Sequence, residues 1–122
     1  MFKKIAFTMY PVTDMARAKA FYEETLGLPP AKDLVPGKWV EFDLPQGGCL
    51  ALTTMVQDIS PSDSAGGSLA FEVEDIHALV DTLKSKDVKL KADVFESPVC
   101  HMAVVLDTEG NAFMLHQLKR KE

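Results

Sequence analysis

The residues of this chain that could carry out acid–base chemistry or bind a metal are few. There are three histidines, at His77, His101 and His116, and two cysteines, at Cys49 and Cys100. Proton transfer needs an imidazole or a carboxylate of suitable pKa, and a divalent metal needs several such groups converging on one point. The sequence contains no Ser-His-Asp arrangement, phosphate-binding loop or CxxC motif. Any chemistry must therefore come from isolated groups that the fold brings together.

Two glutamates in predicted strands, Glu41 and Glu72, are the carboxylates best placed for such a role. Desolvation in apolar surroundings would raise the pKa of either carboxyl group toward the useful range, with His116 as the partner acid or base. The alternative is that Glu41 is solvated at a strand end and that Glu72 has no catalytic role. Catalytic residues therefore remain unknown, with His116, Glu72 and Glu41 as candidates.

Length and charge limit the classes of protein to consider. A chain of 122 residues predicts one compact domain with its own core, and 47% hydrophobic residues fit a globular protein. The net charge of −5 argues against nucleic acid as a partner, and no apolar run approaches the roughly 20 residues of a membrane span. Two isolated cysteines and an N-terminus unlike a signal peptide favour the cytoplasm.

The first half of the chain predicts the order β-α-β-β-β. Ile5–Tyr10 has strand composition, and Asp14 is a suitable N-cap for a helix that ends at Gly27. Apolar residues recur along that helix at helical spacing, at Met15, Ala18, Phe21, Tyr22 and Leu26. Three further strands are predicted, over Lys32–Val35, Lys38–Leu44 and Cys49–Thr53.

The second half predicts the same order. Asp75 again precedes a helix, whose apolar residues are Ile76, Leu79, Val80 and Leu83. Strands are predicted over residues 68–73, 88–94, 99–106 and 111–118, with a tight turn at Asp107–Asn111. We divide the chain into a first module at about 1–56, a linker at about 54–67 and a second module at about 68–122.

Two sets of motifs make the chain resemble a known superfamily. They are Val12-Thr13-Asp14, Ala20-Phe21-Tyr22 and Leu26-Gly27-Leu28 in the first module, and Ala70–Asp75 with Asp107–Asn111 in the second. Together they resemble the vicinal oxygen chelate superfamily, which includes glyoxalase I, bleomycin-resistance proteins and extradiol dioxygenases. The resemblance implies an α+β fold of two tandem βαβββ modules, with sheets curled into a cup and helices on the convex face. It also implies a homodimer.

The resemblance places the usual metal-ligand positions at Phe7, Ala51, Ser68 and Met114. None of these side chains is a usual ligand for a hard or borderline divalent metal. We therefore predict no metal and no cofactor. One alternative is a metal site relocated to Cys100, His116 and Glu72. The competing interpretation is that Cys100 is only a buried thiol and His116 only a hydrogen-bonded histidine at the rim of the cavity.

The register seen in the family would gather an aromatic and sulfur-rich lining inside the cup. The predicted ligand-binding residues are Phe7, Met9, Trp39, Glu41, Cys49, Ala51, Ser68, Cys100, Met102, Met114 and His116, with Thr53, Ala70 and Glu72 on the same face. His101 would lie on the other face. Such a lining is typical of a small-molecule site, and the ring of Trp39 could stack on a planar or cationic ligand.

Three functions follow as hypotheses. The first is metal-independent binding of a small, partly apolar organic molecule. The second is a lyase, isomerase or dioxygenase-type enzyme with a non-standard site around His116, Glu72 and Cys100. The third is a structural dimer whose cup is filled by its own side chains. The sequence leaves open the identity of the ligand and whether modules pair within or between chains.

Overall fold

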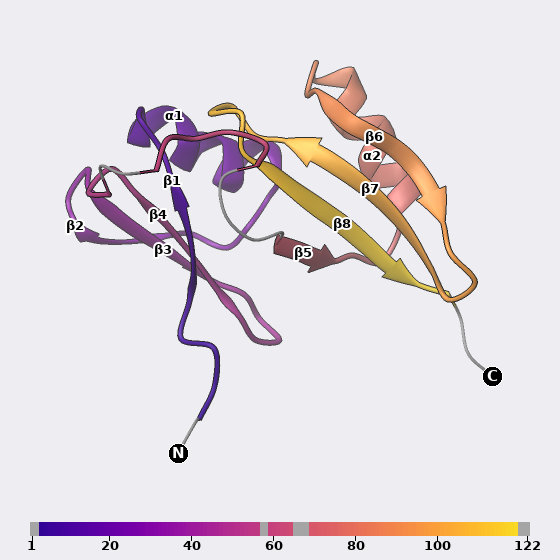
Figure 1. The fold of residues 1–122 in the computed structure, drawn as a ribbon, viewed down its shortest axis with the longest axis horizontal. Coiled ribbons are helices and arrows are strands. Elements are labelled where there is room, and N and C mark those ends of the chain that lie inside the picture. Colours follow the sequence, from indigo (N-terminus) through magenta and orange to yellow (C-terminus); the bar gives the residue numbers. More distant parts are fainter. Residues whose placement is uncertain (1–2, 57–58, 65–68, 120–122) are drawn as a thin grey trace.

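The computed structural model describes residues 3–56, 59–64 and 69–119 of the chain. The described residues form two four-stranded sheets and two helical regions (Figure 1). In chain order the elements are β1 (Thr8–Pro11), α1 (Met15–Ala20), η1 (Phe21–Thr25), β2 (Lys32–Val35), β3 (Trp39–Asp43), β4 (Cys49–Thr53), β5 (Leu69–Glu72), α2 (Ile76–Ser85), β6 (Leu90–Glu96), β7 (Cys100–Leu106) and β8 (Ala112–Leu118). The predicted α+β fold of two tandem βαβββ units is confirmed.

The two sheets repeat one topology. Sheet A has the strand order β1-β4-β3-β2 and sheet B the order β5-β8-β7-β6. The first strand of each unit runs parallel to its last strand, and the other neighbours are antiparallel. Each sheet is therefore mixed, with its first strand at one edge.

Both helices begin at the predicted aspartate caps. The side chain of Asp14 accepts a hydrogen bond from the backbone N–H of Arg17, and that of Asp75 accepts one from Ala78. The first helix is not uniform as the apolar spacing predicted, because η1 is a π-helical segment in which the Leu26 N–H donates to the Phe21 carbonyl. Gly27, at φ +80°, ends it.

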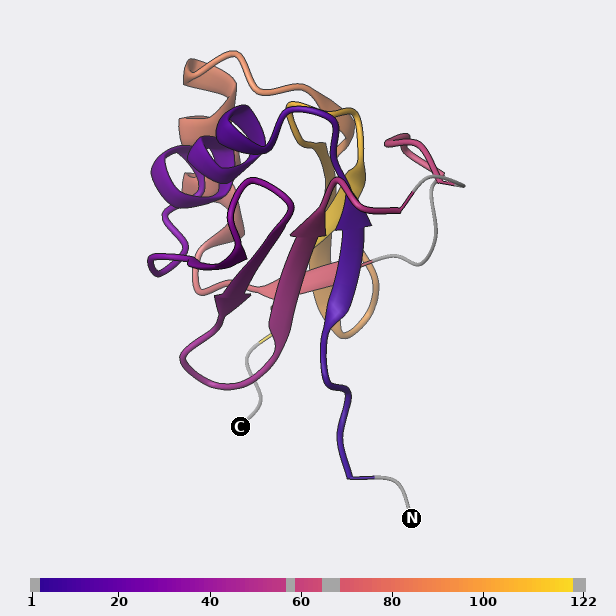
Figure 2. The same cartoon turned by 90° about the vertical axis from the view of Figure 1, so that its left-hand side faces the viewer.

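One hydrophobic core joins the two units. Both helices lie on the same side of the sheets (Figure 2), and their buried residues pack against inward residues of sheet A and sheet B. Aromatic rings span the junction between the units: Phe113 of β8 contacts Phe21 and Tyr22 of the first helical region. The sheets and helices therefore share a single core.

The hairpin between β7 and β8 fastens the second unit to the first. The buried Asp107 carboxylate accepts a hydrogen bond of 2.8 Å from the Tyr22 hydroxyl, and the Asn111 side-chain amide donates to the Pro11 carbonyl at 2.8 Å. The Glu109 carboxylate accepts from the backbone N–H and the hydroxyl of Thr13 and from Arg17. The turn predicted at Asp107–Asn111 therefore also joins the two units. We call the hydrogen bonds that Asp107, Glu109 and Asn111 make to the first unit the latch.

Two strands begin two or more residues later than predicted. β1 begins at Thr8 rather than Ile5, because its partner β4 begins only at Cys49, after the Gly47-Gly48 turn. β6 begins at Leu90 rather than Val88, because the end of α2 continues into a turn at Asp87 (φ +61°) in which the Val88 N–H donates to the Leu83 carbonyl. Within the described residues no helix has the length and apolarity needed to span a membrane.

Candidate functional site

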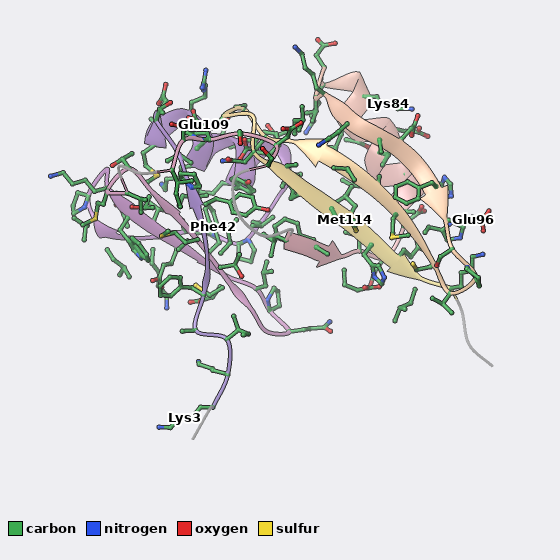
Figure 3. The ribbon with its side chains drawn as sticks, in the orientation of Figure 1. Lys3, Phe42, Lys84, Glu96, Glu109 and Met114 are labelled. Atoms are coloured by element: carbon green, nitrogen blue, oxygen red, sulfur yellow. The ribbon has the colours of Figure 1, made fainter. Side chains whose placement is uncertain are left out.

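Each sheet has one face covered by helices and one face turned away from them, which we call the open face. In β3, for example, Val40 and Phe42 are buried in the core, so Trp39 and Glu41 lie on the open face. The same alternation assigns the residues of the other strands to one face or the other. Figure 3 labels Phe42 on the covered face of sheet A and Met114 on the open face of sheet B. The open face includes Met9, Trp39, Glu41, Cys49, Ala51 and Thr53 of sheet A with Ala70, Glu72, Phe95, Cys100, Met102, Val104, Met114, His116 and Leu118 of sheet B.

The structure therefore brings most of the predicted lining residues to one side of the molecule. Two of them contribute little accessible surface, because Ala51 is fully buried and Cys100 is nearly so. Thr53 is also buried, and its hydroxyl donates to the Lys38 carbonyl. Ser68 lies outside the described residues.

An aromatic pair marks the open face of sheet A. The rings of Phe7 and Trp39 meet edge to face with their centres 5.2 Å apart. Phe7 precedes β1 instead of belonging to it, and it is 42% exposed. The indole N–H of Trp39 donates to the Glu41 carboxylate at 2.8 Å. This contact fixes the indole beside a carboxylate, a combination suited to a flat ligand that carries a donor or a positive charge.

Cys49 lies beside this pair but is not a nucleophile. Burial, and then the nearby carboxylates of Glu41 and Asp43, raise the pKa of the Cys49 thiol to about 11. A thiol must ionise to attack or to bind a metal. Cys49 is therefore a protonated, weakly polar lining group near neutral pH.

A histidine–carboxylate pair marks the open face of sheet B. Nδ1 of His116 lies 2.5 Å from Oε1 of Glu72, and the backbone N–H of Leu118 donates to the other carboxylate oxygen at 3.0 Å. The hydrogen bond from His116 is the main reason that the pKa of Glu72 is lowered. Because Nδ1 donates to a carboxylate, Nε2 is the ring nitrogen left for another partner. Met102 stands directly opposite His116 on β7.

The relocated metal site at Cys100, His116 and Glu72 is not assembled. Cys100 is paired with Leu118, two residues beyond His116, and its sulfur lies 3.1 Å from the Ser97 hydroxyl. No group of three or more His, Cys, Asp or Glu side chains among the described residues is arranged to hold a metal. Strand register explains why this metal site does not form. Cys100 and His116 share a face of the sheet, but they are diagonal neighbours, because Met102 is the residue directly opposite His116.

The metal positions implied by the family resemblance also lack donors. Phe7 and Met114 present a phenyl ring and a thioether, and Ala51 has only a methyl group. This donor set does not fit the hard or borderline divalent metals bound by imidazole and carboxylate groups.

The other two histidines lie away from the open face. His101 is on the helix-covered face of β7, as the alternation predicted, and its ring centre is 5.5 Å from that of His77 in α2. Neither side chain can contribute to a site built around His116.

Two hollows lie between the units, and sequence reasoning identified neither. A groove of about 890 Å³ runs between the β3–β4 turn, the end of η1 and the strand β5, where Ala70 and Glu72 form part of its wall. A smaller hollow of about 450 Å³ lies near the end of α2, beside Phe21 and the β7–β8 turn. Both depend on how the units dock, which no local sequence pattern reports.

Tandem βαβββ units with helices on one face and an open sheet face on the other define a class of α+β folds. Within that class, the family profile for the Glyoxalase/Bleomycin resistance protein/Dioxygenase superfamily matches residues 4–115. The chain belongs to this superfamily. No curated protein sequence matches it closely enough to be counted as a relative.

Several solved structures are similar over nearly the whole chain. TnmS3, an antibiotic binding protein from Streptomyces sp. CB03234, is 26% identical with a TM-score of 0.80, covering 97% of this chain and 98% of its own. A glyoxalase/bleomycin resistance protein from the same organism is 28% identical with a TM-score of 0.74, over 89% and 96% of the two chains. The lactoylglutathione lyase of Agrobacterium tumefaciens, 20% identical with a TM-score of 0.72 over 93% and 92%, shares the fold.

Proposed function

We propose that this protein binds a small, partly apolar organic molecule on the open face of its sheets without using a metal. The observation that carries the proposal is the exposed Phe7–Trp39 pair beside Glu41, together with ligand positions that hold no metal donors. Methionine side chains at Met9, Met102 and Met114 extend this lining across both sheets. Thioethers on flexible chains adapt to ligands of varied shape.

The similarity to TnmS3 supports the same reading. That protein is described as antibiotic binding, and it matches this chain from end to end at 26% identity. A planar, partly aromatic antibiotic is therefore a reasonable first ligand class to test. Binding alone, without turnover, would suffice for sequestration.

The test is a fluorescence titration, because Trp39 is the only tryptophan in the chain. A panel of aromatic antibiotics and planar metabolites is titrated into protein in the presence and absence of EDTA. We expect at least one compound to change Trp39 emission saturably, with the same Kd in both conditions. Binding that EDTA abolishes would overturn metal independence.

Two variants locate the binding surface. Phe7→Ala removes the ring that packs on Trp39 and should weaken binding about two- to tenfold, since an aromatic contact contributes roughly 0.5–1.5 kcal/mol beyond its buried area. His77→Ala changes an exposed residue of α2 on the covered side and is the matched control. Equal affinities in the two variants would show that the ligand does not bind beside Phe7 on the open face.

An enzymatic function is the second candidate, favoured by the contact between His116 and Glu72. A carboxylate that accepts from Nδ1 orients the imidazole and leaves Nε2 free to accept a proton. Any lyase or isomerase activity should then fall at least a hundredfold in His116→Gln, with the melting temperature nearly unchanged. If His116→Gln instead unfolds, the result would show that His116 has a structural role.

We also propose that the protein is a cytoplasmic homodimer that acts on small molecules and not on nucleic acid. The open face leaves Phe7 exposed, and Ile5 before it is 79% exposed, so a second copy has apolar surface to cover. Light scattering coupled to size exclusion should give twice the chain mass. A dimer whose Trp39 emission responds to none of the compounds would instead favour the structural dimer, whose cup is filled by its own side chains.

A further inference from the structure

The helix-covered side of sheet B carries a pair of histidines that the proposed function does not use. His77 lies in the first turn of α2, and His101 lies on β7 beneath it. Their ring centres are 5.5 Å apart, with the ring planes at 69°. Two imidazoles from different elements meet here at the surface, since His77 is exposed and His101 is partly so.

The spacing of these rings matches that of two imidazoles on one metal ion. Metal–nitrogen bonds of about 2.0–2.1 Å put each ring centre roughly 3 Å from the ion, so two rings at a tetrahedral angle have centres about 5 Å apart. The observed separation is close to this value. Because His77 is exposed, its ring can turn about its own side-chain bonds to direct a nitrogen at the ion.

One carboxylate, that of Glu96, lies near the pair and is bound by Lys119. Glu96 of β6 stands directly opposite His101 in the antiparallel ladder, which puts the two side chains on the same face. The pKa of Glu96 is lowered chiefly by its hydrogen bond from Lys119, and further by the charges of Lys119, His101 and His77. Figure 3 shows Glu96 toward the end of β6, on the strand that lies next to β7.

We infer that His77 and His101 together chelate one divalent transition-metal ion of the zinc, nickel or copper type on the helix-covered side of sheet B. Imidazole nitrogen is a preferred ligand of these ions. Around this pair the described residues offer no third assembled donor, since Glu96 is engaged by Lys119. Water molecules complete the coordination, and the affinity is that of a chelate with two imidazole ligands.

Such an ion would tie α2 to β7. The helix otherwise meets sheet B through buried apolar residues, the hydrogen bond from the Ile76 N–H to the Gln117 side chain, and an ion pair between Lys84 and Asp93 near its other end. A bond from each histidine to one ion adds a polar link at the start of the helix. Metal binding should therefore raise the melting temperature in a concentration-dependent way.

The test is calorimetric titration of Ni²⁺ into untagged, metal-free protein near pH 7.5. We expect one Ni²⁺ per chain, and at least a tenfold weaker Kd in each of His77→Asn and His101→Asn. His116→Asn, which changes the histidine of the open face, should bind Ni²⁺ as the unaltered chain does. Undiminished binding in His77→Asn, or binding lost in His116→Asn, would overturn the inference.

A second measurement serves if a variant fails to fold. In the unaltered protein, paramagnetic Ni²⁺ should broaden the ring signals of His77 and His101 at concentrations that leave His116 sharp. Broadening of His116 first would contradict the site. A negative result for Ni²⁺ binding is separate from failure of the proposed function, because Trp39 emission reports ligand binding on the opposite face. Metal that copurifies with the protein counts against metal-independent ligand binding only if it is still present in His77→Asn.

Discussion

At the scale of single residues, the buried polar groups of the β7–β8 turn hold the two units together. Asp107 is almost fully buried, and burial raises the pKa of its carboxyl group even though Tyr22 and the turn backbone donate hydrogen bonds to it. A carboxylate taken out of water is tolerated only when its hydrogen bonds are satisfied. The latch therefore depends on each of its donors.

Tyr22→Phe tests this dependence. The substitution keeps the ring in the core and removes only the donor to Asp107, so it should lower the free energy of unfolding by about 1.5–3 kcal/mol. Urea denaturation at pH 7 measures the change. As a control, Tyr10→Phe removes a hydroxyl whose two partners, the Ala112 carbonyl and the Leu69 N–H, are uncharged backbone groups, so each lost bond should cost only about 0.5–1.5 kcal/mol. Equal costs would show that Asp107 does not need Tyr22.

Glu109 gives the latch a dependence on pH. Burial opposes its ionisation, but hydrogen bonds from Thr13 and Arg17 outweigh burial and lower the pKa of Glu109 below the ordinary 4.5. Below pH 4.5 the unfolded chain then binds more protons at this group than the folded chain does. The stability that Glu109 contributes is present above pH 4.5 and is lost as the pH falls through the folded pKa.

Glu109→Gln should remove that component. At pH 7 the variant should be less stable by about 1.5–3 kcal/mol, and the difference from the unaltered protein should shrink as the pH falls below 4.5. Taking the difference between the two proteins cancels the opposite effect of Asp107, whose raised pKa favours the folded state at low pH. A difference that stays constant from pH 7 to pH 3 would contradict the assignment.

At the scale of elements, the end of the first helical region shows how local chemistry shapes the chain. Gly27 has φ +80°, and nothing lies within 4 Å of the Cβ that another residue would add there. The constraint is therefore conformational and not steric crowding. Residues with a Cβ adopt this left-handed region at a cost, which asparagine bears best.

Two substitutions at Gly27 separate these effects. Gly27→Ala should destabilise the protein by about 1–2 kcal/mol, whereas Gly27→Asn should cost clearly less. Thermal unfolding of the three proteins gives the comparison. If alanine and asparagine cost the same, the left-handed conformation is not what limits this position.

At the scale of the whole molecule, the single core predicts that the two units unfold together. Phe113 of the second unit is fully buried, and its ring centre lies 6.2 Å and 6.0 Å from those of Phe21 and Tyr22 in the first. The two units therefore share aromatic packing that neither could keep alone.

Phe113→Ala should lower the free energy of unfolding by about 3–5 kcal/mol. Because Trp39 lies in the first unit, its fluorescence transition should shift together with the circular dichroism transition of the whole chain. Leu118→Ala, at an exposed position of the same strand, should change stability by less than about 0.5 kcal/mol. A Trp39 transition that does not move in Phe113→Ala would show that the units unfold independently.

The sequence by itself determined the order of elements and the side of each sheet on which a residue lies. Asp14 and Asp75 cap helices because a short side-chain oxygen reaches the free N–H groups of the first turn. Alternation placed Trp39, Met114 and His116 on the open face because successive strand residues point to opposite sides. These are local effects, readable from neighbours in the chain.

Only the tertiary structure decided which of those residues touch. It paired Phe7 with Trp39 and His116 with Glu72, and it separated Cys100 from the metal site that the sequence allowed. It also brought His77 against His101, which no local pattern indicated. Such contacts depend on strand register and on the docking of helix and sheet, and these are set by the fit of the whole core.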